Sequence, residues 1–189
     1  MPDSTRERIL DLAQYLTQTR GYNGFSYADI ATELGIRKAS VHHHFATKAD
    51  LGKAMLVRYR ESFCALLKTI DQKEKNAARK LKRYAQAFAE TLKKDNRMCL
   101  CGMLATDFTT LPRPVREEVK AFFDDNEKWL EGVLEQGRKQ RELKFDGKAA
   151  LAARRLLSSL EGAMLVARSY EDTKRFDTVA QPLIAALAA

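Results

Sequence analysis

Three histidines in a row, His42, His43 and His44, are the first candidates for chemistry in this chain of 189 residues. Imidazole binds metal ions and changes its charge near neutral pH, so a histidine cluster can indicate a metal site. Consecutive residues of a helix point about 100° apart, and three adjacent histidines on a helix therefore cannot converge on one ion. We predict no metal site. His44 is expected to pack inward, with His42 and His43 facing outward.

Two cysteines, Cys99 and Cys101, form the second candidate group. On a helix their sulfur atoms would point about 200° apart, which argues against a disulfide or a shared metal between them. Arg97 and a nearby helix N-terminus would favour a reactive thiolate at Cys99. Two interpretations stay open: a switch operated by oxidation or electrophiles, and a pair of buried structural cysteines. The total of three cysteines argues against a disulfide framework and favours a reducing compartment.

The usual patterns of an enzyme are missing from the sequence. It contains no glycine-rich phosphate loop, no HExxH and no Gly-X-Ser-X-Gly pattern, and the histidines all lie in one segment. We therefore predict a protein that is not an enzyme and that needs no cofactor. No apolar run approaches the ~18 residues of a membrane span, and the first ten residues are too polar for a secretory signal. A cytoplasmic protein with no membrane partner is expected.

The elements that must position these side chains are helices. Apolar residues recur at spacings of three and four, no convincing alternating pattern occurs, and prolines stand only at positions 2, 112, 114 and 182. Hydroxyl residues stand three before a carboxylate at 4–7, 26–29 and 47–50, which is a helix-start signal, and Gly21 and Gly35 are stop signals. The sequence predicts an all-α fold of about nine helices, at 4–20, 27–34, 38–45, 48–71, 74–95, 98–110, 114–140, 147–170 and 173–187.

Residues 26–45, SYADIATELGIRKASVHHHF, have the pattern of a helix-turn-helix. Gly35 can supply the positive φ of the turn, and Ala31 permits a close crossing of the two helices. With Ile36, Val41 and Phe45 facing inward, five side chains project outward, where a recognition helix meets the major groove and its phosphates: Arg37, Lys38, Ser40, His42 and His43.

The segments TRERILDLA, GYNGFSYADIATELGIRKASVHHHF and TKADL together resemble the DNA-binding domain of the TetR/AcrR family of transcriptional regulators over residues 5–51. The resemblance adds Ser26, Tyr27 and Lys48 to the expected DNA contacts, with Ser26 and Lys48 on backbone phosphates. It implies a DNA-binding domain at 1–47 and a ligand-binding and dimerisation domain at 48–189. The sequence departs from the family pattern at Arg37, usually Ser or Thr, at Ala39, usually Gly or a small residue, and at His42, usually Tyr.

The resemblance extends less closely into RMCLCGMLATDF and the helix that follows it, and it implies a homodimer with a small-molecule pocket. Large apolar side chains in one helical layer are candidates for the pocket or for core, and Asn126 and Trp129 are the polar handles within it. The ligand candidates are Phe63, Leu67, Phe88, Met103, Phe108, Phe122, Asn126 and Trp129. The dimer candidates, which are equally consistent with core packing, are Leu157, Leu160, Gly162, Met164 and Val166.

The net charge of +8 is concentrated in the middle third of the chain. Residues 35–60 contain six bases and one acid, residues 61–98 contain ten bases and five acids, and residues 99–189 balance. This polarity favours DNA at the helix-turn-helix and a neutral or hydrophobic effector at the other end. We expect a repressor that binds operator DNA and is released by its effector. A switch at Cys99 and Cys101, or a helical scaffold that does not bind DNA, remain the alternatives.

Overall fold

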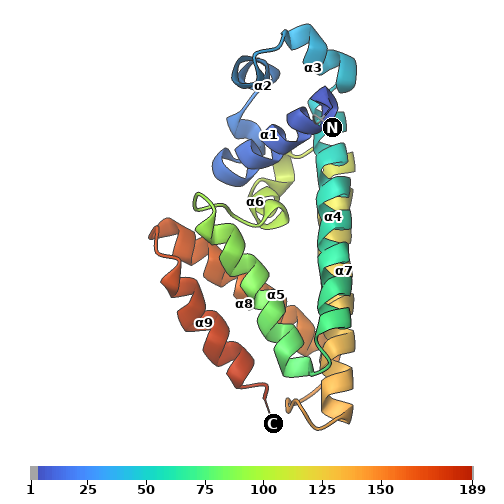
Figure 1. The fold of residues 1–189 in the computed structure, drawn as a ribbon, viewed down its shortest axis with the longest axis vertical. Coiled ribbons are helices and arrows are strands. Elements are labelled where there is room, and N and C mark those ends of the chain that lie inside the picture. The colour runs from blue at the N-terminus through green and yellow to red at the C-terminus, as the bar shows by residue number, and fades with distance from the viewer. Residues whose placement is uncertain (1–3, 189) are drawn as a thin grey trace. The chain divides into compact units, whose positions relative to one another are not determined.

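A computed structural model describes residues 4–188 of the chain. Within them the fold is all-α, as predicted, with nine α-helices, two short 3-10 helices and no β-strand (Figure 1). The elements in chain order are α1 (Thr5–Arg20), η1 (Tyr22–Gly24), α2 (Tyr27–Leu34), α3 (Lys38–His44), α4 (Lys48–Lys73), α5 (Ala77–Lys93), α6 (Leu100–Thr106), η2 (Phe108–Thr110), α7 (Arg113–Lys139), α8 (Ala149–Ser169) and α9 (Lys174–Ala185).

Local capping chemistry determines where the first helices begin and end. Ser4 caps α1 by accepting from the amide of Glu7, and Ser26 forms a complete capping box with Asp29 at α2. Thr47 and Asp50 exchange the same pair of hydrogen bonds at the start of α4, at 3.0 and 3.1 Å. These bonds satisfy amides that have no partner inside the helix. All three predicted helix starts are therefore confirmed.

Two predicted helices differ most from the structure in their bounds, the one at 74–95 and the one at 98–110. Asn76 caps α5 by accepting from the amide of Arg79, so α5 begins at Ala77 rather than at position 74. The chain leaves α5 through Asp95 and Asn96, which both have positive φ. The predicted helix 98–110 is two pieces, α6 and η2, separated by Asp107.

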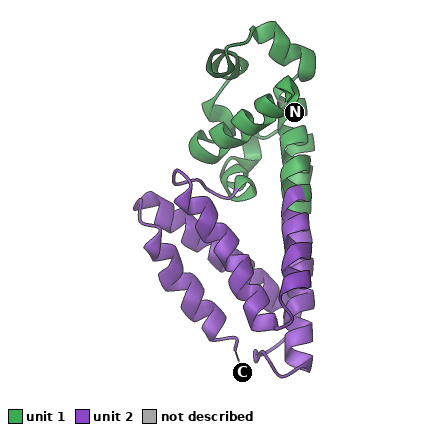
Figure 2. Cartoon of the chain, viewed as in Figure 1, with its two compact units in different colours: residues 1–61, 100–122 green, residues 62–99, 123–189 purple. Residues whose placement is uncertain are grey.

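The chain forms two compact units (Figure 2). Among the described residues, unit 1 comprises 4–61 and 100–122, and unit 2 comprises 62–99 and 123–188. The long helices α4 and α7 contribute residues to both units, and α6 belongs to unit 1. These boundaries differ from the functional division that we predict at residue 47, which stays a prediction.

Unit 1 contains the helix-turn-helix, α2 and α3, packed on α1. Ile30 and Val41 are fully buried at the crossing of α2 and α3, and Phe45, directly after α3, is buried as well. The turn between the two helices is Gly35, with φ 65° in the left-handed region, where a side chain would be strained. The predicted turn glycine is thus confirmed, and it determines the direction in which α3 leaves α2.

Unit 2 is built on α5, α8 and α9, with the C-terminal part of α4 and most of α7. Helix α8 packs against both α5 and α9 (Figure 1). The core contains two rings that are fully buried, Tyr84 and Phe176, and the buried apolar residues of α8. Among the described residues no helix is long and apolar enough to cross a membrane.

Candidate DNA-binding surface and effector site

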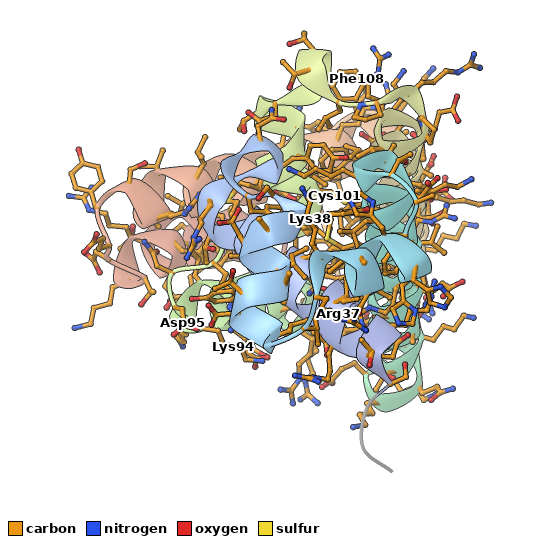
Figure 3. All side chains as sticks on the ribbon, turned by 90° about the horizontal axis from the view of Figure 1, so that it is seen from above. Arg37, Lys38, Lys94, Asp95, Cys101 and Phe108 are labelled. Atoms are coloured by element: carbon orange, nitrogen blue, oxygen red, sulfur yellow. The ribbon has the colours of Figure 1, made fainter. Side chains whose placement is uncertain are left out.

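Helix α3 exposes the side chains that the sequence predicts for DNA. Arg37, Lys38, His42 and His43 are exposed, whereas Ser40 is half-buried. Arg37 is the N-cap residue of α3 and Lys38 is its first residue; both are labelled in Figure 3. His44 is half-buried, and its ring meets that of His43 edge-on at 5.4 Å. The exposed set combines a guanidinium, an ammonium and two imidazoles on one short helix, which is the chemistry that contacts phosphates and base edges.

Ser26 is exposed at the start of α2, as a phosphate contact requires, but its hydroxyl already has partners. The oxygen accepts from the amides of Ala28 and Asp29, and the hydroxyl donates to the Asp29 carboxylate at 2.7 Å. The hydrogen bond from Ser26 holds the pKa of Asp29 below its usual value. Ser26 therefore shapes the helix start in this structure, and its contact with DNA stays a prediction.

Tyr27 is the expected DNA contact that the structure places inside the protein. Its side chain is only 6% exposed, and its hydroxyl donates to the carbonyl of Phe45 at 3.0 Å. Its ring lies edge-on to His42 at 4.8 Å. Burial, helped by the charge of Asp50, raises the pKa of Tyr27 to about 12. Tyr27 therefore ties α2 to the end of α3 in this structure, and its contact with DNA stays a prediction.

Lys48 also has intramolecular partners. Its ammonium donates to the carbonyls of Tyr22, at 2.6 Å, and Phe25, and it lies over the rings of the same two residues. The Tyr22 hydroxyl donates in return to the Lys48 carbonyl at 2.8 Å. Burial lowers the pKa of the Lys48 ammonium, although the charge of Asp29 opposes the shift. Lys48 thus fastens η1 to the start of α4, and its phosphate contact stays a prediction.

The eight effector candidates fall in both compact units. Phe63, Leu67, Phe88, Asn126 and Trp129 belong to unit 2, whereas Met103, Phe108 and Phe122 belong to unit 1. Phe122 is buried and packs on Tyr59 at 5.5 Å. Phe108 is half-buried under Arg116 and Lys120, and Met103 is half-buried.

In unit 2 the aromatic candidates surround Tyr84, a residue that the sequence analysis overlooked. The ring of Trp129 stacks on Tyr84 at 5.4 Å, and Phe88 lies 5.2 Å from it. Phe63 approaches both Tyr84 and Phe88 edge-on, at 6.1 and 6.2 Å. Such offset and edge-on arrangements are the favourable ones for aromatic rings. We call these four rings, Phe63, Tyr84, Phe88 and Trp129, the aromatic cluster.

Both predicted polar handles have partners within the protein. The amide oxygen of Asn126 accepts from the Tyr84 hydroxyl at 2.8 Å, and Asn126 is 1% exposed. The indole of Trp129 donates to Asp71 at 2.9 Å. The other oxygen of Asp71 accepts from the buried Lys80 at 2.7 Å. These bonds connect α4, α5 and α7, and they arise from pairs up to 58 residues apart, which no local pattern signals.

Glu161 is, after Tyr84, the second residue that sequence analysis overlooked. The stem of Glu161 is partly exposed, yet both carboxylate oxygens are buried, and neither has a hydrogen-bond partner of normal geometry among the described residues. Burial raises its pKa from 4.5 to about 7, and a weak interaction with the Cys99 thiol opposes the shift. A signal did exist, because Glu161 interrupts the apolar stripe of Leu157, Leu160 and Met164.

Cys99 and Cys101 are buried, at 3% and 0% exposed, and among the described residues neither they nor the half-buried Cys64 form a disulfide. Arg97, expected to activate Cys99, donates to the Asp95 carboxylate at 3.1 Å, and its effect on Cys99 stays a prediction. The Cys99 thiol interacts with the carboxylate of Glu161. Among residues 4–188 no group of three or more histidine, cysteine or acidic side chains is arranged to hold a metal.

The dimer candidates on α8 divide into two sets. Leu157, Leu160 and Met164 are buried inside unit 2, so they have almost no surface to offer a second copy. The part of these three residues in a dimer stays a prediction. Gly162 is exposed, and Val166 is 52% exposed. The large apolar side chains that the structure leaves exposed on α8, at the end of α8 and on α9 are Leu151, Leu165, Val166, Tyr170 and Val179.

Two family models match separate parts of the chain. A family model for bacterial regulatory proteins of the tetR family matches residues 9–55, and one for the tetracyclin repressor-like C-terminal domain matches residues 77–183. The crystal structure of a TetR-family transcriptional regulator from Agrobacterium tumefaciens is similar, with a TM-score of 0.95, 34% identity and 97% of both chains covered.

Two curated relatives have lower identity over most of the chain. The nucleoid occlusion factor SlmA of Photobacterium profundum is 29% identical, covering 96% of this chain and 95% of its own length. The HTH-type transcriptional repressor NemR of Escherichia coli is 27% identical, covering 88% and 87%. The expectations of a TetR-type regulator and of a protein that is not an enzyme are confirmed. The chain belongs to the TetR family of bacterial regulatory proteins and is a DNA-binding transcriptional regulator.

Proposed function

We propose that the chain is a repressor that binds operator DNA as a homodimer, with α3 of each copy in the major groove, and leaves the DNA when a small molecule binds in the C-terminal half. The observation that carries the DNA part is the exposed group on α3. Arg37, Lys38, His42 and His43 all reach solvent from a helix whose inner side is buried. Arg37 is suited to reading a guanine, and Lys38 to a phosphate.

The contacts that hold α3 in place favour this function as much as the exposed side chains of α3 do. Tyr27 and Gly35 determine the direction of α3, and Lys48 fastens the loop that leads into α2. A recognition helix held in one orientation loses little conformational freedom on binding, which improves affinity and specificity. Ser26 and Lys48 remain candidates for phosphate contacts at the edges of this surface.

A homodimer follows from the needs of DNA recognition and from the surface of unit 2. One helix-turn-helix binds weakly, and two copies on half-sites about one helical turn apart give useful affinity. Large apolar or aromatic side chains are exposed on α8 and at its end, namely Leu151, Leu165, Val166 and Tyr170. The exposed Gly162 permits a close approach between α8 of one copy and α8 of the other. Val166→Asp should shift the protein from dimer to monomer in light scattering, whereas Lys75→Asp, at an exposed position between α4 and α5, should not.

The trigger that we favour is an apolar small molecule in unit 2, near the aromatic cluster. A ligand releases DNA only through its higher affinity for the state that does not bind DNA, and typical coupling free energies are about 1–3 kcal/mol. The alternative trigger, modification of Cys99 or Cys101, is less favoured because both thiols are buried. A cytoplasmic location accords with access to chromosomal DNA.

The test of the proposal begins with selection of bound duplexes from a random pool by the full-length protein. A palindromic site should emerge, and a reporter under its control should be expressed less when the protein is present. A reporter that rises with the protein would make it an activator. A protein that selects no sequence and whose affinity is independent of salt would favour the helical scaffold.

A further inference from the structure

The carboxylate of Glu161 is a buried polar group that the protein leaves without a normal hydrogen-bond partner. It projects from the face of α8 that also carries the buried Leu157 and Met164. Both oxygens are buried and unpartnered among the described residues. The neighbour that interacts with it, the Cys99 thiol, is a weak donor, and the Cys99 amide itself donates to the sulfur of Met164.

Glu161 lies within electrostatic reach of Tyr84, and among the described residues no cation lowers the pKa of Glu161. Helix α8 packs on α5, which carries Tyr84 and Phe88 of the aromatic cluster. The negative charge of Glu161 acts on Tyr84 and, after burial, helps to raise the pKa of that phenol. The Tyr84 hydroxyl donates to Asn126, and the buried ammonium of Lys80 is paired with Asp71. These two buried donors of unit 2 therefore have other partners.

A carboxylate in this position is costly to the folded protein. Burying a charged group without a partner costs far more free energy than burying a neutral polar group without a partner does. Nearly all buried polar atoms in proteins therefore have hydrogen-bond partners. The cost falls when a positive donor meets the carboxylate, because charge-assisted hydrogen bonds are the strong ones in a dry interior. A ligand that brings such a donor relieves the unfavourable free energy of the buried carboxylate, and this relief adds to the affinity of the ligand.

Resting on the proposed effector-controlled function, we propose that Glu161 is the specificity-determining residue of the effector site and that the effector is an apolar, aromatic-compatible molecule carrying a basic nitrogen. The nitrogen donates to the Glu161 carboxylate, and its positive charge is also attracted to the faces of the aromatic cluster. This proposal replaces a neutral effector with a hydrophobic cation. An acidic effector is disfavoured, because its charge would be placed beside the same carboxylate.

A metal ion is a poorer match to these residues than an amine is. Calcium and magnesium ions need several oxygen ligands, and the described residues contain no group of acidic, histidine or cysteine side chains arranged to hold a metal. A single amine is satisfied by one carboxylate and by ring faces. Glu161 as a whole is partly exposed, whereas its carboxylate oxygens are buried.

The experiment compares three probes of one shape: naphthylethylamine, naphthylethanol and naphthylacetate. Each is titrated into the full-length protein without DNA by isothermal calorimetry, and each is then added to the protein–operator complex. The amine should bind about tenfold or more tightly than the alcohol, which is the gain expected of a hydrogen bond to a buried charge. The acetate should bind most weakly, and the amine should release operator DNA at the lowest concentration.

Two variants assign the preference to Glu161. Glu161→Gln keeps the shape and removes the charge, and it should reduce the ratio of amine to alcohol affinity to about one. Glu161→Met provides a second variant if the glutamine form folds poorly. Glu135→Gln, at an exposed glutamate of α7 in the same unit, is the matched control and should leave the ratio unchanged.

The outcomes separate this proposal from the proposed function. Equal binding of amine and alcohol, no binding of the amine, or a preference that survives in Glu161→Gln would overturn the role of Glu161 while operator binding stood. Failure of the protein to bind any operator would overturn the proposed function. The calorimetric comparison of the probes contains no DNA and would still decide the role of Glu161.

Discussion

The helix-turn-helix segment and the core of unit 2 differ in whether their buried polar groups have hydrogen-bond partners. Around the helix-turn-helix, the Tyr27 hydroxyl, the Tyr22 hydroxyl and the Lys48 ammonium each donate to a backbone carbonyl. In unit 2, the oxygens of the Glu161 carboxylate are buried, and among the described residues neither has a hydrogen-bond partner of normal geometry. The hydrogen bonds around the helix-turn-helix hold α2 and α3 in one orientation. The core of unit 2 instead contains a buried carboxylate whose unfavourable free energy a ligand can lower.

The largest expected effect concerns Glu161 and pH. Its pKa is raised from 4.5 to about 7 in the folded protein, so its contribution to stability is present below pH 4.5 and is lost as the pH rises through 7. The shift corresponds to a loss of about 3 kcal/mol. Glu161→Gln should therefore stabilise the protein at pH 8, by up to that amount, and much less at pH 5. Urea unfolding at the two pH values measures it, and a gain that is independent of pH would contradict a buried ionisable Glu161.

Arg37→Ala should cause the next largest change. A guanidinium that reads a guanine contributes about 1–3 kcal/mol of discrimination, and a dimer has two copies. Operator affinity should fall about a hundredfold, and base preference should relax at one position of each half-site. Lys75→Ala is the matched control, because Lys75 is also exposed but lies between α4 and α5. A uniform decrease over all sequences would instead make Arg37 a phosphate contact.

Tyr27→Phe should act on stability and hardly on DNA contacts. The variant removes the hydroxyl that donates to the carbonyl of Phe45 and leaves that carbonyl without this donor, which costs about 1–2 kcal/mol. Chemical unfolding should show this decrease, and the salt dependence of operator binding should stay as in the parent protein. A lower operator affinity with unchanged stability would support Tyr27 as a DNA contact.

Cys99→Ser should have the smallest effect on regulation. Because Cys99 is buried beside a carboxylate, we predict that DNA release by oxidants and by the amine probe is the same in parent and variant. Operator binding followed by anisotropy, with and without a mild oxidant, checks this. Disappearance of an oxidant response in the variant would establish the cysteine switch as the trigger.

Most of the fold could be predicted from sequence because its signals are local. Capping pairs such as Ser26 with Asp29 and the glycine turn at Gly35 act within a few residues, and the predicted helix starts agree with the structure within three. Asn76 was the local signal that was overlooked, and it moved the start of α5. Local chemistry therefore determined the helices, and the exposure of Arg37 and Lys38 followed from the same periodicity.

The candidate site was less predictable because its decisive contacts are distant in sequence. Lys48 and Tyr22 are 26 residues apart, and Tyr84 and Asn126 are 42 residues apart. An apolar stripe on α8 is the same whether it packs inside one chain or against another, so Leu157 could not be assigned to the core from sequence alone. Glu161 was visible as an interruption of that stripe, but its burial depends on the packing around α8.

The most direct test of the central claim is the salt dependence of operator binding. Each phosphate that a lysine or arginine neutralises adds a slope of about 0.9 to the plot of log affinity against log salt concentration. We predict a steep fall for the parent protein and a slope smaller by about two for Lys38→Ala, because each copy of the dimer then neutralises one phosphate fewer. Lys75→Ala should leave the slope unchanged. A flat dependence in the parent protein, or equal slopes in all three, would contradict DNA recognition through α3.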